Sequence, residues 1–374
     1  MPWPNNLKLF ERIRSIRSSS ENERAPNGSL AIWYHWAPAK KGQSPRAAVD
    51  VHVNLWRLRV RKRSTEEETF LDIGLRLSDI SSIADFKIYL PFRLDHAHDI
   101  VDLGKILEDR TTLMAVFNEA YFPGDPDAAG TFSISGAGGK EVLCCHALRP
   151  GIDFTLAARN YGTIVHFNAE LCSRFRSNSG QYIRFRIMLK GARGQAFSRM
   201  ERQYDRFLLS SKPRDEVVEF RLNEQRSLPH DIGDEMTSTD NYELFRITSI
   251  HYFLIRESDS QCVLYHSDFH KVRLLEDILW SKYLTGTRAG ALRHDSFIYH
   301  WRRIAAPNDD LGDFHALAKF RRLITGWPTI MFYLVVIFAI GISGNLLASW
   351  FWEHWLSAKP APAASATPPG RGQP

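Results

Sequence analysis

Two histidines flanked by acids make the segment DHAHD, Asp95 to Asp99, the best candidate for metal chemistry in the sequence. Side chains two positions apart point the same way from a strand, so His96 and His98 could begin a zinc or iron site. Such a site needs at least a third ligand, and no second recognisable cluster accompanies this one. The segment also lies between an expected strand and an expected helix, where Asp99 could cap the helix. The sequence favours this polar loop and keeps the metal site as the alternative.

No other motif points to a reaction. HSDFH places His266 and His270 four residues apart but lacks the glutamate of HExxH. The glycine-rich stretch Ser135–Glu141 lacks the first glycine and the final hydroxyl residue of a phosphate loop. We therefore expect no cofactor, and binding is favoured over catalysis.

A basic stretch supports a more specific hypothesis about binding. Between Glu170 and Glu201 the sequence contains arginines and lysine but no acid. Within it, alternating apolar and basic residues predict a strand with one buried face, while Arg184 and Arg186 share the opposite, wet face. Such a face could bind a nucleotide, a lipid headgroup or RNA, with a tyrosine stacking on a ring. The expected ligand-binding residues are Arg174, Arg176, Tyr182, Arg184, Arg186 and Lys190. The alternative is a solvated face whose charges pair with nearby acids.

The segment from Leu323 to Trp352 carries no formally charged residue. A helix needs only about 20 apolar residues to cross the bilayer, so we expect a transmembrane helix over 326–352. Lys319, Arg321 and Arg322 precede it, whereas only one lysine and one arginine follow. The positive-inside rule then places the preceding domain in the cytoplasm, at the inner (plasma) membrane. The proline- and alanine-rich residues 353–374 should form a disordered tail outside.

Small residues in the second half of this segment suggest that the helix also meets another helix. Gly341, Gly344, Asn345 and Ala348 fall at i, i+3, i+4 and i+7, which is one helical face. Small residues let two helices approach closely, and a buried Asn can bond across them. We expect the protein to form homo-oligomers through this face, and a plain membrane anchor is the alternative.

Composition limits the class of protein. The 374 residues are 44% hydrophobic and 12% aromatic, which is enough for a folded core and excludes a disordered chain. The net charge of +6 favours anionic neighbours without choosing among them. The four cysteines, Cys144, Cys145, Cys172 and Cys262, show no CxxC spacing, so we expect reduced thiols in a cytosolic compartment.

Hydrophobic periodicity predicts a mainly β protein. Many short alternating segments over 29–267 indicate a large antiparallel β-sandwich or barrel-like cytoplasmic domain, with a division into two subdomains left open. In Val49–Val60 the alternation slips by one place near Trp56. Residues 1–28 form a basic arm that fits an amphipathic helix. Residues 268–325, including Phe269–Leu284 and Leu311–Ile324, are expected to form a short helical neck before the span.

Three functions fit these features. The favoured one is a membrane-anchored module that binds or senses an anionic ligand or partner and self-associates through its span. The first alternative is an effector that disrupts the membrane when it oligomerises, as in bacterial anti-phage systems, which is an analogy of layout alone. The second is a membrane-tethered, metal-dependent enzyme that uses His96 and His98. The sequence does not identify the ligand or any other protein partner, and it leaves open whether catalysis occurs, the oligomeric state and the pathway.

Overall fold

The structure is a computed structural model of the 374-residue chain, and it describes residues 28–37, 45–60, 66–176, 179–201, 212–238, 242–288, 295–324 and 327–356. The expected N-terminal arm, apart from Gly28, and the tail beyond residue 356 lie outside the described residues. The chain divides into a β domain, within Met1–Arg202 and Arg214–Arg322, and a second unit that contains the C-terminal helix. The two units are described separately below.

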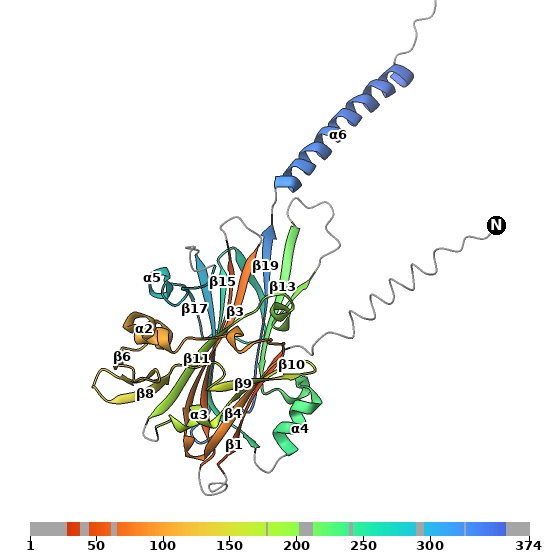
Figure 1. The fold of residues 1–374 in the computed structure, drawn as a ribbon. Helices are drawn as coiled ribbons and strands as arrows, with labels where there is room; N and C mark the ends of the chain where they lie inside the picture. The colour runs from red at the N-terminus through yellow and green to blue at the C-terminus, as the bar shows by residue number, and fades with distance from the viewer. Residues whose placement is uncertain are drawn as a thin grey trace, which may run out of the picture. The chain divides into compact units, whose positions relative to one another are not determined.

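The β domain consists of two large sheets, so the expectation of a mainly β fold is confirmed (Figure 1). The nine-stranded sheet has the order β16-β19-β13-β1-β4-β10-β9, with β12 paired to β13 and β14 paired to β1. Its strands are β1 (Ser29–Trp36), β4 (Ile83–Leu90), β9 (Phe154–Arg159), β10 (Gly162–Phe167), β12 (Ser198–Glu201), β13 (Lys212–Leu222), β14 (Tyr242–Leu244), β16 (Ser260–Tyr265) and β19 (Phe314–Ile324).

The ten-stranded sheet has the order β17-β18-β15-β2-β3-β11-β8-β7-β6, with β5 paired to β11. Its strands are β2 (Ala48–Arg59), β3 (Glu67–Ser78), β5 (Ile100–Asp102), β6 (Phe122–Pro123), β7 (Thr131–Ser135), β8 (Glu141–His146), β11 (Gly180–Met188), β15 (Arg246–Glu257), β17 (Lys271–Leu274) and β18 (Ser296–Ile304). Most neighbours are antiparallel, but β1–β13, β2–β15 and β8–β11 run parallel, so both sheets are mixed.

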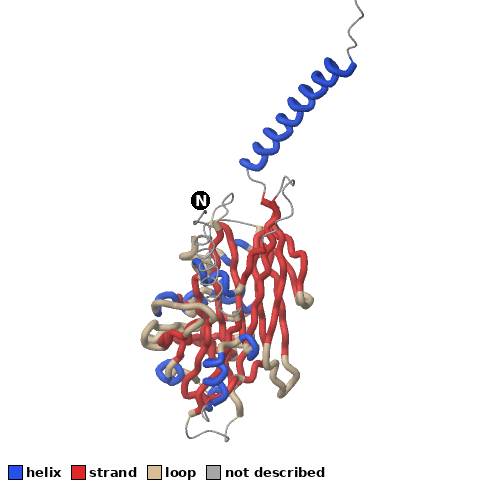
Figure 2. The backbone as a smooth tube through the Cα atoms, turned by 90° about the vertical axis from the view of Figure 1, so that its right-hand side faces the viewer, coloured by secondary structure: helices blue, strands red, loops and turns tan. Residues whose placement is uncertain are grey.

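The two sheets pack face to face as a sandwich around one large core (Figure 2). Alternation along each strand supplies this core: Ile183, Phe185 and Ile187 of β11 all point into it. Phe220 of β13 stacks on Tyr252 of β15 with ring centroids 4.6 Å apart, which joins the two sheets directly. Strand β2 pairs with β3 in one register from Ala48 to Arg59, so it contains no bulge. The expected slip near Trp56 is a change of face: the apolar side chains up to Leu55 point into the core, and Trp56 and Leu58 lie in a separate cluster on the outer face.

Short helices cover the outer face of each sheet (Figure 1). On the nine-stranded sheet, α4 (His230–Ser238) buries Ile232 and Met236 against Trp33 and Tyr89. On the ten-stranded sheet, α5 (Asp277–Trp280) and the turn after it pack on apolar side chains of β2 and β3, beside α2 (Arg110–Phe117). A further short helix, α3 (Ala169–Ser173), follows β10.

The expected helical neck is wrong. Strands β17, β18 and β19 all lie within 268–325, and each pairs into one of the two sheets. The segment Leu311–Ile324 was expected to be helical because the hydrophobic period changes after about residue 268. However, Phe314, Ala316, Ala318 and Phe320 alternate into the core, which is the period of a strand. Only α5 in this region is α-helical among the described residues.

The second unit contains α6 (Trp327–Phe351), which with the turn after it includes a helical segment long and apolar enough to cross a membrane. That segment, Ile330–Trp355, is 26 residues long, and no residue of its most apolar 18-residue stretch is buried by other parts of the described chain. An apolar helix without protein cover would expose its side chains unfavourably to water, which a lipid environment avoids. The position agrees with the span expected over 326–352.

Candidate functional site

The outer face of the ten-stranded sheet carries most of the polar side chains that could bind a ligand. Strands β18, β15, β2, β3 and β11 lie next to one another in that order. Their pairing registers align the outward side chains in rows across the sheet. One row is His300, Phe253, Asn54, Asp72 and Arg186; the next is Arg302, His251, His52, Gly74 and Arg184; the third is Ile304, Ser249, Asp50, Arg76 and Tyr182.

The expected basic strand face points the right way but does not meet solvent. Arg184 and Arg186 project from β11 on the side opposite the core, as the alternation predicted, yet they are only 1% and 3% exposed. Tyr283, in the turn after α5, lies over them and accepts hydrogen bonds from both guanidinium groups. The solvent exposure expected for Arg184 and Arg186 is therefore wrong, because a layer of helix and turn covers this face.

We call Trp56, Asp72, Arg184, Arg186 and Tyr283 the covered cluster. Asp72 accepts two hydrogen bonds from the Arg186 guanidinium, at 2.7 and 3.0 Å, and one each from Trp56 Nε1 and the Tyr283 hydroxyl. Arg184 donates to the hydroxyl groups of Tyr182 and Tyr283, at 3.0 and 2.7 Å. Every charge in the covered cluster is thus bonded to neighbouring protein groups, which is what burial requires.

Gly74 lets this arrangement exist. It lies on β3 between His52 and Arg184 in its row. A Cβ atom added there would be 2.3 Å from the Tyr182 hydroxyl and 2.9 Å from Arg184 Nη1. The tyrosine and arginine side chains therefore occupy the space that any other residue at position 74 would fill.

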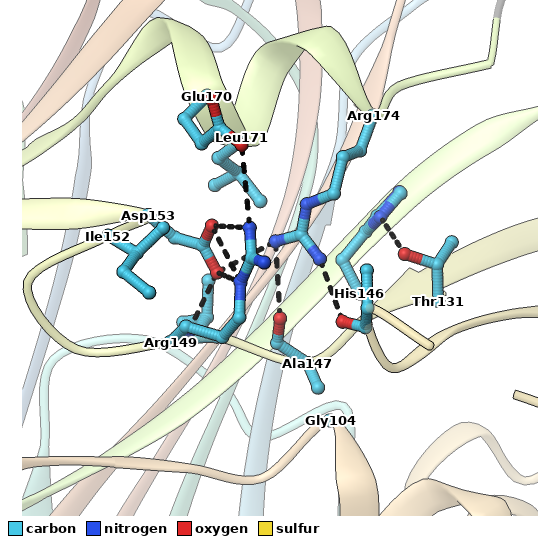
Figure 3. Close-up of polar contacts among 12 residues, drawn as sticks. Gly104, Thr131, His146, Ala147, Arg149, Ile152, Asp153, Glu170, Leu171 and Arg174 are labelled. Carbon is cyan, nitrogen blue, oxygen red and sulfur yellow. Dashed lines mark hydrogen bonds and ion pairs between the residues drawn. The ribbon is translucent and has the colours of Figure 1, made fainter. Parts of the chain in front are cut away.

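Arg174 belongs to a separate network around the buried carboxylate of Asp153 (Figure 3). Arg149 and Arg174 converge on the carboxylate of Asp153, which is 0% exposed, and each donates a hydrogen bond of 2.8 Å to it. Arg174 also donates to the backbone carbonyls of Ala129 and Ala147. These contacts join the loop before β9 to the chain after α3, so Arg174 stabilises the fold locally.

The remaining members of the expected basic face do not assemble into a site. Tyr182 is fully buried and packs against Phe117, so its ring cannot stack on a ligand. Arg176 and Lys190 are exposed, but one precedes β11 and the other follows it. The structure therefore brings Tyr182, Arg184 and Arg186 together beneath the covering layer, but it does not join the six residues into one site.

The DHAHD segment forms a turn tied together by hydrogen bonds. The Asp99 carboxylate accepts from the backbone N–H groups of Asp95 and His96, and Arg193 bridges the carboxylates of Asp95 and Asp99. His96 and His98 are both exposed. Within the described part of the chain, no three His, Cys, Asp or Glu side chains cluster in a way that could hold a metal ion.

A cavity of about 520 Å³ opens beside the covered cluster, where the covering layer ends. Its floor comes from the last two rows, and its walls come from the end of α2 and the loop after β18. The lining residues are Asp50, His52, Arg76, Phe117, Glu119, Tyr121, Arg246, Thr248, Ser249, His251, Arg302 and Ile304–Asn308. We call this space the cavity.

Two guanidinium groups of the cavity have no acid partner. Arg76 is half-buried and Arg302 exposed, and neither makes a hydrogen bond or ion pair with any residue that the structure describes. Arg246 is paired with Asp79 at 3.3 Å. The lining also contains two carboxylates, Asp50 and Glu119, while Asp79, the partner of Arg246, lies outside it. The part of the cavity suited to an anion is therefore the guanidinium groups of Arg76 and Arg302, which are unpaired among the described residues.

Four histidines lie in a row beside the arginines. Ring centroids are 5.1 Å apart for His52 and His251, 5.3 Å for His251 and His300, and 5.2 Å for His300 and His270. Burial, with a smaller contribution from neighbouring cations and imidazoles, lowers the pKa of His251 to about 4 and that of His300 to about 3. Burial also holds the pKa of His52 well below its ordinary value, helped by His251, Arg184 and Arg76.

The cavity residues were missed in the sequence because no single segment contains them. Asp50 and His52 stand two apart in β2, and Ser249 and His251 stand two apart in the neighbouring β15. Polar residues at every second position of two otherwise apolar strands were the available signal. Their meeting depends on the parallel pairing of β2 with β15, which is not visible in the sequence.

On α6, a shallow groove of about 390 Å³ is lined by Val336, Ala339, Ile340, Ser343, Gly344 and Leu347. Added Cβ atoms at Gly341 and Gly344 would meet nothing within 4 Å in the single chain. The small residues of the expected helix–helix face, including Asn345 and Ala348, are all exposed. The groove shares only Gly344 with that face and extends along the neighbouring strip of Ala339 and Ser343.

Comparisons with known proteins do not add a family. No protein-family model matches the chain, and no curated protein matches it. Among solved structures, the chain is similar to the Fcho1 Mu homology domain of Danio rerio with bound Eps15 peptide, at 8% sequence identity and with 81% of each chain covered. The TM-score is 0.11, so this likeness carries no argument about fold or function.

Proposed function

We propose that this protein is a membrane-anchored binding module whose β domain takes an anionic ligand in the cavity. The observation that carries the proposal is Arg76, a half-buried guanidinium with no acid partner among the described residues. A partly desolvated charge without a counter-charge is unfavourable, and a bound anion would offset that cost. Arg302 faces the same space, and His52 and His251 are neutral, so they do not compete for the anion as cations.

We place the β domain on the cytoplasmic side of the inner (plasma) membrane, with α6 as a single span. Lys319, Arg321 and Arg322 stand just before α6, and a bias of this kind favours the cytoplasmic side. The four cysteines are free thiols, which suits a reducing compartment. Alkaline phosphatase fused after residue 374 should be active in a bacterial host, since the tail would lie outside. Activity only when the enzyme is fused ahead of α6 would reverse the orientation.

Two copies are proposed to associate through α6. The groove beside Ala339 and Ser343 allows close approach of a second helix, and Asn345 provides a polar group that gains from a partner in lipid. In a membrane reporter assay for helix association, Gly344→Ile should weaken the signal, whereas Ile342→Leu, which keeps a large apolar residue, should not. Equal signals for Gly344→Ile and the unchanged span would make α6 a plain anchor.

Anion binding is tested on the full-length protein in nanodiscs. Inorganic phosphate should raise the melting temperature in a concentration-dependent way, because a ligand that binds only the folded state stabilises it. Arg76→Gln should remove most of this effect. Arg303→Gln is the matched control, since Arg303 is an exposed arginine of the same strand as Arg302 but does not line the cavity. An identical phosphate response in Arg76→Gln and the unchanged protein would overturn the proposal.

A further inference from the structure

The cavity also contains a cluster of hydrogen-bond acceptors. Asp50 Oδ1 accepts hydrogen bonds from the Thr248 hydroxyl at 2.6 Å and the Ser249 hydroxyl at 2.8 Å. The Ser249 proton is used on this carboxylate oxygen, and the single Thr248 proton has the Val49 carbonyl oxygen, at 3.2 Å, as a second acceptor. Asp50 Oδ2 has no hydrogen bond from any residue that the structure describes, and the lone pairs of both hydroxyl groups are left over. This part of the cavity accepts hydrogen bonds and has no proton of its own to offer.

The other part of the cavity donates hydrogen bonds. Arg76 supplies a guanidinium, and a chain of donors orients His52. Arg184 Nη1 donates to the Tyr182 hydroxyl at 3.0 Å, and we assign the tyrosine proton to His52 Nδ1, which is 3.4 Å away. A neutral imidazole that accepts at Nδ1 carries its proton on Nε2. His52 therefore adds a second donor near Arg76.

Donors and acceptors are thus separated within one space. Asp50 and Arg76 face each other across β2 and β3, as a register pair, but they form no ion pair. Instead, Asp50 is held by the hydroxyl groups of β15. A ligand that bridges the two must carry an anionic group at one end and hydroxyl donors at the other.

We propose that the cavity binds a hydroxylated phosphate ester of the sugar-phosphate class. The phosphate lies against Arg76 with help from Arg302 and His52, and the sugar hydroxyl groups donate to Asp50 Oδ2 and to the oxygens of Thr248 and Ser249. The volume of about 520 Å³ is within the range of roughly 300–1,000 Å³ usual for small-molecule sites. This inference rests on the proposed function, because it assigns a ligand class to the same cavity.

The same chemistry has two possible sources at a membrane. A free sugar phosphate reaches the cavity from solution, whereas an inositol phospholipid presents a hydroxylated phosphate ester from the bilayer. The two sources are separated by carrying out the measurement in two kinds of nanodisc.

The test is isothermal titration calorimetry of the full-length protein in phosphatidylcholine nanodiscs, with glucose 6-phosphate, inorganic phosphate and glucose as probes. Glucose 6-phosphate should bind about tenfold or more tightly than inorganic phosphate, as expected for added hydrogen bonds to a carboxylate. Glucose alone should show no binding. Asp50→Asn should reduce the affinity for glucose 6-phosphate to near that for phosphate, while phosphate binding persists and shows that the variant is folded.

Asp313→Asn is the matched control, because Asp313 is exposed and lies outside the cavity. It should leave both affinities unchanged. Equal affinities of the unchanged protein for glucose 6-phosphate and phosphate would overturn the sugar-phosphate assignment and leave the anion site standing. Absence of binding by every anion, phosphate included, would instead remove the proposed function itself.

Replacing part of the phosphatidylcholine with phosphatidylinositol identifies the source. Weaker apparent binding of glucose 6-phosphate in these nanodiscs supports a lipid headgroup, because the lipid competes for the cavity. Unchanged binding supports a free sugar phosphate. If phosphatidylinositol weakened glucose 6-phosphate binding equally in Asp50→Asn and in the wild-type protein, that result would contradict recognition of the lipid hydroxyl groups by Asp50.

Discussion

Two aspartate–arginine pairs face each other across neighbouring strands on the same side of the ten-stranded sheet, and they behave differently. In the covered cluster, Asp72 and Arg186 are a register pair joined by an ion pair of 2.7 Å. In the cavity, Asp50 and Arg76 are also a register pair, but Asp50 is bonded to two hydroxyl groups and Arg76 has no acid partner among the described residues. One pair is complete, and the other is open to a third component.

The covering layer explains the difference. The turn after α5 places Tyr283 over the covered cluster, where water is excluded and an unpaired charge would be very unfavourable. The cavity lies where this layer ends, so its guanidinium groups keep partial access to water. Because water reaches the cavity, its guanidinium groups can remain unpaired and available to a ligand. The charges of the covered cluster, which water does not reach, must instead be paired with other protein groups.

The largest effect is expected from breaking the covered pair. Asp72→Ala leaves the buried Arg186 without its counter-charge and removes the acceptor used by Trp56 and Tyr283. Loss of one partner of a buried ion pair costs about 3–5 kcal/mol of unfolding free energy. Urea unfolding followed by tryptophan fluorescence measures this loss.

Asp313→Ala serves as the control for Asp72→Ala, since Asp313 is exposed and should change stability by less than about 0.5 kcal/mol. A loss below about 1 kcal/mol for Asp72→Ala would show that the covered cluster is not sealed from water, and the contrast with the cavity would disappear.

A smaller effect is expected at the boundary between the two regions. Gly74→Ala places a Cβ atom 2.3 Å from the Tyr182 hydroxyl, so Tyr182 and Arg184 must move. Overpacking of this kind costs about 1–3 kcal/mol. Gly138→Ala is a matched control, because an added Cβ there meets nothing within 4 Å. If the two variants unfolded at the same urea concentration, the tight packing over Gly74 would be incorrect.

Much of the architecture could be predicted from the sequence because period-2 alternation reports which face of a strand is buried. The strands that supply the core, such as β11, were found in this way. The same rule failed for β19, where small alanines at the core positions resemble a helical pattern. The choice between helix and strand there depends on the neighbouring β13 and β16, which lie far away in the sequence.

The candidate site was less predictable than the fold. Alternation correctly placed Arg184 and Arg186 opposite the core, but it cannot report what covers the other face. Tyr283, which covers Arg184, lies 99 residues after it in the sequence. The cavity likewise depends on the pairing of β2 with β15. Whether a given arginine is structural or available to a ligand is therefore set by tertiary contacts, which local patterns do not contain.

Lowering the pH should destabilise the protein through the histidines beside the cavity and not through the covered cluster, because the covered cluster contains no histidine. The pKa of His251 is about 4 in the folded protein, against an ordinary value of 6.5, so the unfolded chain binds more protons between these values. The contribution of His251 to the free energy of unfolding is therefore fully present above pH 6.5, and it should be lost as the pH falls toward about 4. His300, with a pKa of about 3, and His52 act in the same direction.

Urea midpoints between pH 7 and pH 4 measure this dependence. His251→Gln should make the decline shallower, although Asp50, Arg302 and His270 still surround the position. His98→Gln is the control, because His98 is exposed and lies in the turn before β5, outside the histidine row. A decline that His251→Gln leaves unchanged would place the acid sensitivity outside the cavity and weaken the contrast.

The smallest effect on stability is expected from replacing Arg76, the unpaired arginine of the cavity. Arg76→Gln removes a charge that has no partner among the described residues, so the free energy of unfolding should change by less than about 0.5 kcal/mol. The pKa of His52 should rise at the same time, because Arg76 is one of the cations that lower it. An NMR titration of the imidazole protons would detect this shift, with Arg303→Gln as the control. A loss of stability near that of Asp72→Ala would mean that Arg76, like Arg186, stabilises the fold. Arg76 would then not be available to bind a ligand.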